Sequence, residues 1–382
     1  MAGAGKRILF IQTQAENAGA QEISRLLARE LEARGHDARH LFFYRKTDGF
    51  DRMAKTLILC HKRPGNPIAF LRFCLALIRA IRAIRPDIVF TFQHFGNVFG
   101  APAARLAGVR CIVANQVSAR ETIHPLVRLL DRFIGQTPVY SRITINSHNL
   151  MGDYENFPQA YRRKLVLVPH GFEDKALDLG KRAARERLGL AADKPLLGTV
   201  ARLNEGKQID RAIGLLTHRA DWHLAIAGQG PDLERLQTIT RALGLTDRVH
   251  FLGERAQSEI GLVLAALDVF VFPTRAETFG LAAVEAGQAG VPIVANDLPV
   301  LREVLAVDGE ACAVLVDVND EAAFAKAVET ILANPALARQ MSERACGLKR
   351  KYSLSAMVDA YEAMVLNETR DLVLQIKSAI VS

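Results

Sequence analysis

Short apolar runs alternate with helical patterns along most of this chain of 382 residues. The runs that predict buried strands in the first part are residues 7–12, 41–44, 87–92, 111–114, 142–146 and 166–169. After a more polar stretch at 171–194, strands are predicted at 197–200, 224–227, 249–252, 269–272, 292–295 and 313–316. Short strands separated by helices are typical of parallel βαβ units. The pattern therefore predicts two open α/β units, a fold class that binds ligands in a crevice at the carboxyl ends of its strands.

Composition narrows the class of protein further. With 49% hydrophobic and 24% charged residues the chain is too apolar to be disordered. Its length suits two domains at ~100–200 residues each. No uncharged apolar run approaches the ~18 residues of a membrane span, and the run after Lys6 and Arg7 is too short for a signal-peptide core. The five cysteines are far apart and lack metal-ligand spacing, so we expect a reduced, cytoplasmic, soluble protein without structural zinc.

The positive charge is concentrated in the first half of the chain. Residues 1–180 contain 26 lysines and arginines against 15 acids, whereas the remainder contains 23 against 26. Much of the excess lies at residues 55–85, where Arg72, Arg79, Arg82 and Arg85 recur on an otherwise apolar helical segment. Such a segment is compatible with an anionic membrane surface, or with an ordinary amphipathic helix that packs on a sheet, which is the commoner case. No nucleic-acid-binding motif accompanies the charge, so nucleic acid is not an expected partner.

The most specific pattern lies in the second half. Glu277 and Glu285 are eight residues apart, and Phe279-Gly280-Leu281 follows the first of them. A helix is predicted to begin near Gly280, which puts Glu277 in the preceding loop and Glu285 on the early turns. Unpaired amides at such a helix start favour an anion. Taken alone, two glutamates are more often a helix cap and a solvated residue.

Two cations follow an upstream strand. Arg202 and Lys207 lie in the loop after residues 197–200, where an arginine fork and a lysine point charge suit a diphosphate. The next strand ends in AGQGP (residues 227–231), a weak match to a dinucleotide fingerprint because no glycine follows Gly230 at the required spacing.

Together these elements resemble the retaining glycosyltransferases of family 4, which have the GT-B fold. The resemblance rests on the loop from Gly198 to Lys207, the AGQGP turn, the strand at residues 249–253, and the pair Glu277 and Glu285. Looser matches in the first half are residues 17–21 (NAGAQ), 35–37 (GHD), 86–89 (PDIV) and 168–172 (VPHGF).

The resemblance implies two Rossmann-like, doubly wound parallel-sheet domains that face each other across a cleft. We expect an acceptor-side domain at residues 1–172, a nucleotide-sugar-binding domain at 173–355, and C-terminal helices at 356–382 that cross back to the first domain.

The resemblance also implies roles for individual residues. Arg202 and Lys207, with amides near Gly280 and Leu281, would hold the diphosphate of a nucleotide-sugar. Glu277 would hold hydroxyls of the transferred sugar and Glu285 the ribose. Phe279 is expected at the donor site, and the loop at Gly19 would approach the donor from the other domain. In this family retention is usually explained by front-face attack, in which the leaving phosphate takes the acceptor proton, so neither an enzymic nucleophile nor a metal is expected.

The acceptor side departs from the family pattern. Many members carry a histidine where this chain has Asn115 and Gln116, which supply hydrogen bonds but no acid–base chemistry. His94, after the strand at 87–92, is the alternative polar group, and Arg120 is a weaker candidate for an acceptor phosphate.

The predicted function is transfer of a hexose-type sugar to a lipid-linked or polysaccharide acceptor, such as a lipopolysaccharide intermediate, at the inner face of the cell membrane. A catalytically silent binding or scaffold protein of the same fold is the alternative. A nucleotide-dependent dehydrogenase is less favoured, because the full glycine fingerprint is missing.

Overall fold

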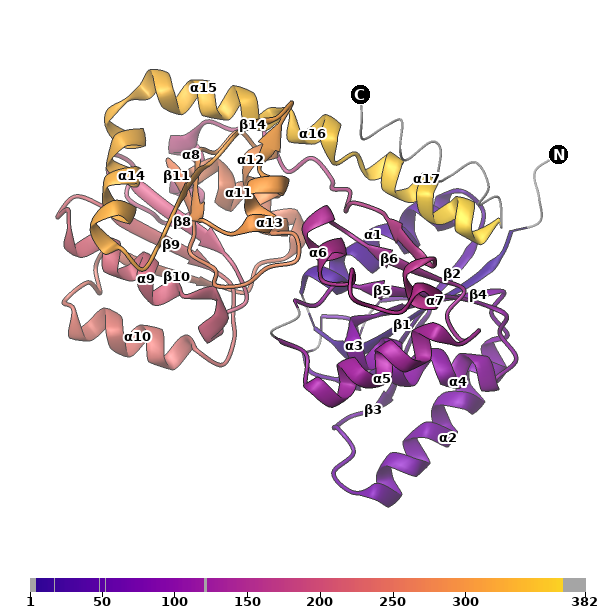
Figure 1. Cartoon of the computed structure of the whole chain (residues 1–382). Coiled ribbons are helices and arrows are strands. Elements are labelled where there is room, and N and C mark those ends of the chain that lie inside the picture. The colour runs from indigo at the N-terminus through magenta and orange to yellow at the C-terminus, as the bar shows by residue number, and fades with distance from the viewer. Residues whose placement is uncertain (1–4, 17, 48, 52, 120–121, 367–382) are drawn as a thin grey trace. The chain divides into compact units, whose positions relative to one another are not determined.

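The chain divides into two compact units, which a computed structural model describes over residues 5–16, 18–47, 49–51, 53–119 and 122–366 (Figure 1). Unit 2 is Phe172–Ser353, and unit 1 is formed by the chain before and after it. Each unit is built around its own parallel sheet. The predicted α/β class with two doubly wound sheets is confirmed.

Unit 1 contains a seven-stranded parallel sheet in the order β3-β2-β1-β4-β5-β6-β7. Its strands are β1 (Arg7–Ala15), β2 (Asp37–Arg45), β3 (Thr56–Cys60), β4 (Ile88–Phe92), β5 (Cys111–Gln116), β6 (Arg142–Ile145) and β7 (Leu165–Leu167). Its helices are α1 (Gly19–Ala33), α2 (Pro67–Ile84), α3 (Gln93–Phe95), α4 (Ala101–Leu106), α5 (Pro125–Gln136), α6 (His148–Gly152), α7 (Gln159–Arg162) and α17 (Leu354–Val365), with a π-helical turn η1 at Gly96–Gly100.

Unit 2 contains a six-stranded parallel sheet in the order β10-β9-β8-β11-β12-β15. Its strands are β8 (Leu196–Val200), β9 (His223–Ala227), β10 (Val249–Gly253), β11 (Val269–Phe272), β12 (Ile293–Asn296) and β15 (Val314–Val316), beside a hairpin of β13 (Ala306–Val307) and β14 (Glu310–Ala311). Its helices are α8 (Lys181–Leu188), α9 (Ile209–Gly214), α10 (Leu233–Ala242), α11 (Gln257–Ala266), α12 (Leu281–Gln288), α13 (Pro299–Val304), α14 (Glu321–Ala333), α15 (Pro335–Cys346) and α16 (Leu348–Lys351), with short turns η3 (Glu205–Lys207) and η4 (Leu215–Thr217).

Both faces of the second sheet are buried, which explains its uninterrupted apolar strands. In β8, Leu196 enters one core and Leu197 the other, and in β11 Phe270 and Val271 divide in the same way. Successive residues of a strand point to opposite faces, so a sheet covered by helices on both sides needs apolar residues at every position. This requirement made the strands recognisable from their sequence.

The strand order reverses direction at one place in each sheet. In unit 1, β2 lies on one side of β1 and β4 on the other. In unit 2, β9 lies on one side of β8 and β11 on the other. Loops after the two central strands diverge there and leave a crevice at their carboxyl ends. The loops in question carry Gly19 and His94 in unit 1, and Lys207 and Glu277 in unit 2.

The last described helix belongs to unit 1. On α17, Glu362 accepts a hydrogen bond from Arg34 and Tyr361 donates one to Asn115. The amide of Gly171 points at the sulfur of Met357 at 3.2 Å. Residues 367–382, part of the expected C-terminal helices, lie outside the described residues.

The two ends of unit 2 lie together. Phe172 and Ser353 form an isolated parallel bridge, and the Phe172 amide donates to the Tyr352 carbonyl at 3.3 Å. Among the described residues, no helix combines the length and the apolar character needed to cross a bilayer.

Candidate functional site

An ion pair lies at the reversal point of the unit 2 sheet. Lys207 ends the turn after β8, Glu277 lies in the loop after β11, and the ammonium of the first contacts Oε1 of the second. The side chains are 24% and 14% exposed, so the pair is largely screened from water yet reachable. The Lys207 ammonium also lies 5.5 Å from the centre of the Phe272 ring. The structure thus joins two residues that the sequence places seventy positions apart.

Two buried polar side chains fix the Glu277 loop. The Thr274 hydroxyl lies 3.2 Å from Glu277 Oε1 and 3.4 Å from the Gly206 carbonyl oxygen. Asn296, at the end of β12, donates to the Thr274 carbonyl at 3.0 Å. Sequence reasoning missed both residues, although each is a polar residue at the carboxyl end of an apolar strand: Asn296 ends β12, and Thr274 lies two residues after β11. That position alone marks them, because strand carboxyl ends line the ligand crevice in this class of fold.

The glycine turn after β9 serves a different purpose from the one its sequence suggests. A Cβ on Gly228 would lie 1.8 Å from the Ala201 carbonyl oxygen, and one on Gly230 would lie 2.1 Å from that of Leu203. Only glycine lets the two backbones approach this closely. The Leu203 amide then donates to the Gln229 carbonyl at 3.0 Å. The turn therefore clamps the loop that carries Arg202.

The predicted helix start is confirmed at α12. Gly280 precedes it with φ +88°, a left-handed conformation, and a Cβ there would lie 2.7 Å from Leu301 Cδ2. The first amides of α12, at Leu281 and Ala282, are half-buried and lack partners within the helix itself. Glu285 lies on the second turn and is half-buried.

Phe279, expected at the donor site, is 2% exposed. Its ring packs 4.9 Å from that of Tyr352 and 6.0 Å from that of Phe172. These contacts give the side chain a place in the core, from which it supports the neighbouring Gly280.

The loop after β4 in unit 1 is strained. Gln93 has φ +65°, an uncommon value for a residue with a side chain. Its side chain accepts a hydrogen bond from the Thr13 amide at 3.3 Å. His94 follows, with Nδ1 3.5 Å from the Ser118 hydroxyl. Burial, and secondarily the Arg63 guanidinium, lowers the pKa of His94, which favours the neutral ring.

His94 lines a cavity of about 320 Å³ in unit 1. The wall includes Ser118 after β5, and Arg128, Leu129 and Arg132 from α5. Its floor is Asp131, whose carboxylate accepts hydrogen bonds from Tyr140 at 2.9 Å and Tyr161 at 2.7 Å. Burial raises the pKa of the Asp131 carboxyl, although these bonds favour the charged form.

The other acceptor-side candidates lie deeper in unit 1. Gln116 is 3% exposed, and its amide nitrogen donates to Asp131 at 3.0 Å. Asn115 is fully buried; it donates to the Thr91 carbonyl at 2.9 Å and accepts from Thr144 and Tyr361. The hydrogen-bond partners of both side chains are protein groups. Gln116 also lines the His94 cavity, whereas Asn115 lies in the interior of unit 1. Arg120 lies outside the described residues.

Gly19 is the first residue of α1, after a half-buried Ala18 whose side chain offers no cap. The amides at this helix start sit at the carboxyl end of β1. The nearest approach to a metal-binding acid pair in the sequence, Asp317 and Asp320, has local roles. Asp320 caps α14 through the Ala323 amide at 3.0 Å, and Asp317 accepts from the Asn319 amide at 2.9 Å.

Chemically, unit 2 offers a cation, a carboxylate and a row of helix amides around one crevice. The cation and amides suit a phosphate group, and the carboxylate accepts hydrogen bonds from hydroxyls. Two doubly wound parallel-sheet units, each with candidate groups at its reversal point, define a protein of the GT-B class.

Family models match both units. The glycosyl transferases group 1 model matches residues 180–346, and the glycosyl transferase 4-like domain model matches residues 18–171. The chain belongs to the glycosyl transferases of group 1, the GT4-type proteins.

Curated relatives agree with this membership. The chain is 30% identical over 217 residues to the lipopolysaccharide core biosynthesis mannosyltransferase LpsB of Rhizobium meliloti, covering 52% of this chain and 61% of the relative. It is 35% identical over 201 residues to a GDP-mannose-dependent α-(1-6)-phosphatidylinositol dimannoside mannosyltransferase of Mycobacterium tuberculosis, covering 51% and 50%. These matches span about half to three-fifths of the relatives' length.

Solved structures share the fold over nearly the whole chain. A sucrose-phosphate synthase from Thermosynechococcus elongatus has a TM-score of 0.80 at 20% identity, covering 95% of this chain and 98% of the other. Anabaena HepE in complex with UDP-glucose has a TM-score of 0.80 at 19% identity, covering 95% and 100%. At these identities the likeness establishes the GT-B fold.

Proposed function

We propose that this chain transfers a hexose-type sugar from a nucleotide diphosphate-sugar to a lipid-linked or polysaccharide acceptor, with retention of configuration and without a metal. The observation that carries the proposal is the Lys207–Glu277 pair beside the start of α12. Several relatives are named for sugar transfer in lipopolysaccharide, O-antigen or glycolipid synthesis, which favours this class of acceptor.

In the proposed donor complex, Lys207 and Arg202 hold the diphosphate together with the amides of Leu281 and Ala282. Glu277 accepts hydrogen bonds from hydroxyls of the transferred sugar, and Glu285 from the ribose. Thr274 keeps the Glu277 carboxylate in place, because its hydroxyl lies within donor distance of Glu277 Oε1, at 3.2 Å.

Departure of the nucleotide diphosphate builds negative charge on its oxygens while the anomeric carbon becomes electron-poor. Cations and amides that are already fixed stabilise this charge more than they stabilise the bound donor, and this difference lowers the barrier. In a front-face reaction the acceptor hydroxyl attacks from the side of the leaving phosphate, which takes its proton. The anomeric C–O bond to phosphate breaks as the bond to the acceptor oxygen forms.

The cavity beside His94 is the proposed acceptor site. Its neutral imidazole, the Ser118 hydroxyl and the arginines of α5 offer hydrogen bonds to a glycan or to an anionic group on it. The sub-neutral pKa of His94 leaves one ring nitrogen as an acceptor at neutral pH, so the ring orients a hydroxyl without carrying charge.

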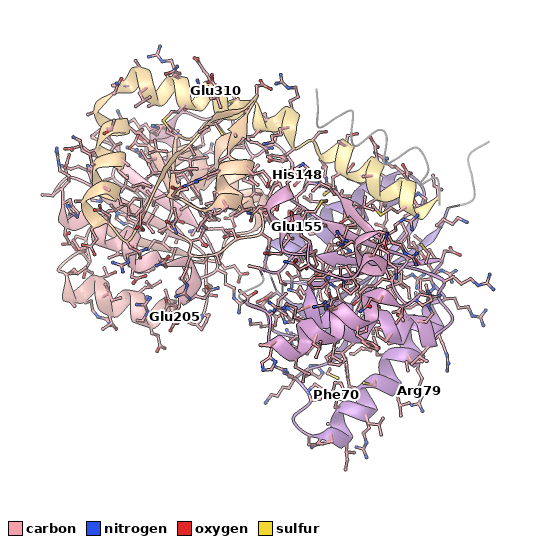
Figure 2. All side chains as sticks on the ribbon, in the orientation of Figure 1. Phe70, Arg79, His148, Glu155, Glu205 and Glu310 are labelled. Atoms are coloured by element: carbon pink, nitrogen blue, oxygen red, sulfur yellow. The ribbon has the colours of Figure 1, made fainter. Side chains whose placement is uncertain are left out.

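Donor hydrolysis tests the proposal. We expect Lys207→Ala and Glu277→Ala each to lower kcat/KM for hydrolysis of the accepted nucleotide-sugar by about 100-fold or more, on the scale of a lost oxyanion contact. Glu205→Ala is the matched control: it removes an exposed acid from the same turn, labelled in Figure 2.

Two outcomes contradict the assignment. Parent-like turnover in both variants removes Lys207 and Glu277 from the site. Nucleotide binding without turnover for any of the UDP-, GDP- and ADP-sugars would favour the binding or scaffold alternative.

A further inference from the structure

Apolar side chains are unusually exposed on two helices of unit 1. Among the described residues, eight of the thirteen large hydrophobic side chains that are exposed lie on α2 and α5. They are Ile68, Phe70, Leu71, Leu75, Leu126, Leu129, Leu130 and Phe133. We call this set the α2–α5 face. A patch of this kind on a single fold unit marks an interaction surface.

The face follows from helix periodicity and not from loose packing. On α5 the exposed residues Leu126, Leu129, Leu130 and Phe133 recur at helical spacing, while Val127 and Gly135 face the interior. On α2 the interior is filled by Phe73, Leu77 and Ile81. Each helix therefore has two apolar sides: one packs against the rest of unit 1, and the other faces outward.

The two helices are joined through the turn η1. The Phe70 ring of α2 packs edge-on against Phe99 at 5.2 Å, and α5 packs against the same turn. Figure 2 labels Phe70 and Arg79 on α2, and Figure 1 shows α5 on the same side of the unit 1 sheet as α2. The exposed apolar residues of both helices thus lie on the same side of the unit 1 sheet.

The charge around this region is mainly positive. Residues 52–136 contain thirteen lysines and arginines and three acids, Asp87, Glu121 and Asp131. Asp87 accepts a hydrogen bond from the Arg7 amide at the amino end of the sheet. The acid of α5, Asp131, is buried in its hydrogen-bond network. The helix α2 contains no acidic residue. Exposed Arg72 and Arg79 therefore flank its apolar residues without an acidic partner on the same helix.

We propose that the α2–α5 face docks unit 1 on an anionic phospholipid bilayer. Apolar side chains enter the acyl boundary while arginines contact the headgroups, the arrangement of an interfacial helix. The excess of positive charge selects this occupant over a second copy of the chain, because two such faces would repel each other. Binding to the bilayer does not depend on sugar transfer.

Docking also bears on the acceptor, and this step rests on the proposed function. Arg128, Leu129 and Arg132 line the His94 cavity and belong to the helix that would lie on the lipid. The cavity mouth then opens at the headgroup level, where a lipid-linked sugar presents its glycan while its chain stays in the membrane.

Vesicle co-sedimentation of the full chain tests the proposal. We expect binding to vesicles that contain phosphatidylglycerol, little binding to pure phosphatidylcholine, and weaker binding at high salt. The pair Leu126→Ser with Phe133→Ser, both solvent-facing and away from the cavity wall, should weaken binding by about tenfold or more. Arg72→Gln with Arg79→Gln should weaken it by about fivefold for each arginine.

The matched controls lie in unit 2. Leu177→Ser with Leu243→Ser removes two side chains that are 46% and 45% exposed, and should leave vesicle binding unchanged. Arg187→Gln with Arg241→Gln removes two exposed positive charges from unit 2 and should also leave vesicle binding unchanged. Equal binding by the α5 variant, or binding that ignores phosphatidylglycerol, overturns the proposal. So does a lipid-free dimer that the α5 variant dissociates, which would assign the face to a second copy.

Donor hydrolysis separates this proposal from the proposed function. The α2 and α5 variants should hydrolyse a soluble nucleotide-sugar at the parent rate. If the parent binds vesicles but hydrolyses no donor, the proposed function fails and the docking face stands. If it hydrolyses a donor but binds no vesicles, the docking face fails and the proposed function stands.

Discussion

At the scale of single residues, the candidate donor site depends on backbone proximity as much as on charge. Arg202 lies on a loop that is held against the turn after β9 by amide–carbonyl bonds. Those bonds form only because Gly228 and Gly230 present no side chain to the Ala201 and Leu203 carbonyls. The position of a cation is thereby set by two residues that have no functional group.

The first prediction concerns Gly230→Ala. Its new methyl would lie 2.1 Å from the Leu203 carbonyl oxygen, so the Arg202 loop must shift. We expect nucleotide affinity to fall by about tenfold or more and unit 2 to lose about 1–3 kcal/mol of stability. Isothermal titration with the donor nucleotide and chemical denaturation measure the two effects.

Gly214→Ala is the control for that substitution. Gly214 ends α9, and a Cβ there meets nothing within 4 Å. Alanine should be neutral or slightly stabilising, by up to about 1 kcal/mol, because it reduces the freedom of the unfolded chain. A Gly230→Ala protein that behaves like Gly214→Ala would show that the clamp does not position Arg202.

The second prediction concerns acid stability. The His40 ring is buried between Phe10 and Phe42, with ring centres 5.2 and 6.0 Å away, and burial lowers its pKa to about 3. His170, also buried, has its pKa lowered to about 3. The unfolded chain takes up protons below pH ~6.5 and the folded chain does not, so stability falls as pH drops from there toward 3.

For each of the two rings the loss at pH 5 is about 2 kcal/mol, given the unfolded-state pKa of ~6.5. His40→Phe should remove about 2 kcal/mol of the pH dependence of unit 1 unfolding between pH 7 and 5, measured by denaturation at each pH. His61→Phe alters an exposed ring and should keep the parental slope. An unchanged slope in His40→Phe would contradict the assignment.

Which residues lie at a crevice was partly predictable from sequence. Lys207, Glu277 and Gly280 follow buried strands, so the parallel topology alone brings them to one edge of the sheet. Burial was not predictable for Phe279, Asn115 and Gln116, because a residue after a strand end turns inward or outward according to partners elsewhere in the chain. For Gln116 and Asn115 those partners include Asp131 on α5 and Tyr361 on α17.

At the scale of elements, the central strands and three of the four edge strands, β7, β10 and β15, were predictable from their apolar runs. The central strands were located to within about three residues because their apolar runs are continuous, except that β2 begins four residues before its predicted start at residue 41. β3 (Thr56–Cys60), a half-exposed edge strand that pairs only with β2, was missed. The β13–β14 hairpin has two residues in each strand, too few for a periodic signal.

The third prediction concerns the docking of α17. Tyr361 is 2% exposed, packs 5.2 Å from Phe90 and donates to Asn115. Tyr361→Ala should cost unit 1 about 3–5 kcal/mol, and Tyr361→Phe about 1 kcal/mol, since only the hydrogen bond is lost. Ser355→Ala, at an exposed position of the same helix, should cost less than about 0.5 kcal/mol. Equal stability of all three variants in denaturant would mean that α17 adds nothing to unit 1.

At the scale of the whole molecule, each unit has its own sheet and its own buried core. Structures built this way commonly unfold in more than one step. The fourth prediction is that calorimetry resolves two transitions with different sensitivities. A nucleotide diphosphate should raise the unit 2 transition, by about 2.7 kcal/mol at a concentration of 100 Kd, while acid lowers the unit 1 transition.

Lys207→Ala should reduce the nucleotide-induced shift without altering the acid-sensitive transition, and His40→Phe should do the reverse. A single transition that responds to both conditions would indicate that the units unfold as one cooperative body.

The bridge between Phe172 and Ser353 has a consequence for how the gene can be divided. Because the first and last residues of unit 2 lie side by side, the gene segment that encodes unit 2 can be exchanged as one piece. A short linker could replace it, or the homologous segment of another family member could be inserted. Neither change would pull apart the chain ends of unit 1. Under the proposed function, recombination at these two codons would exchange the unit assigned to the donor and keep the unit assigned to the acceptor. Donor preference would then change in one genetic step while acceptor choice stays the same.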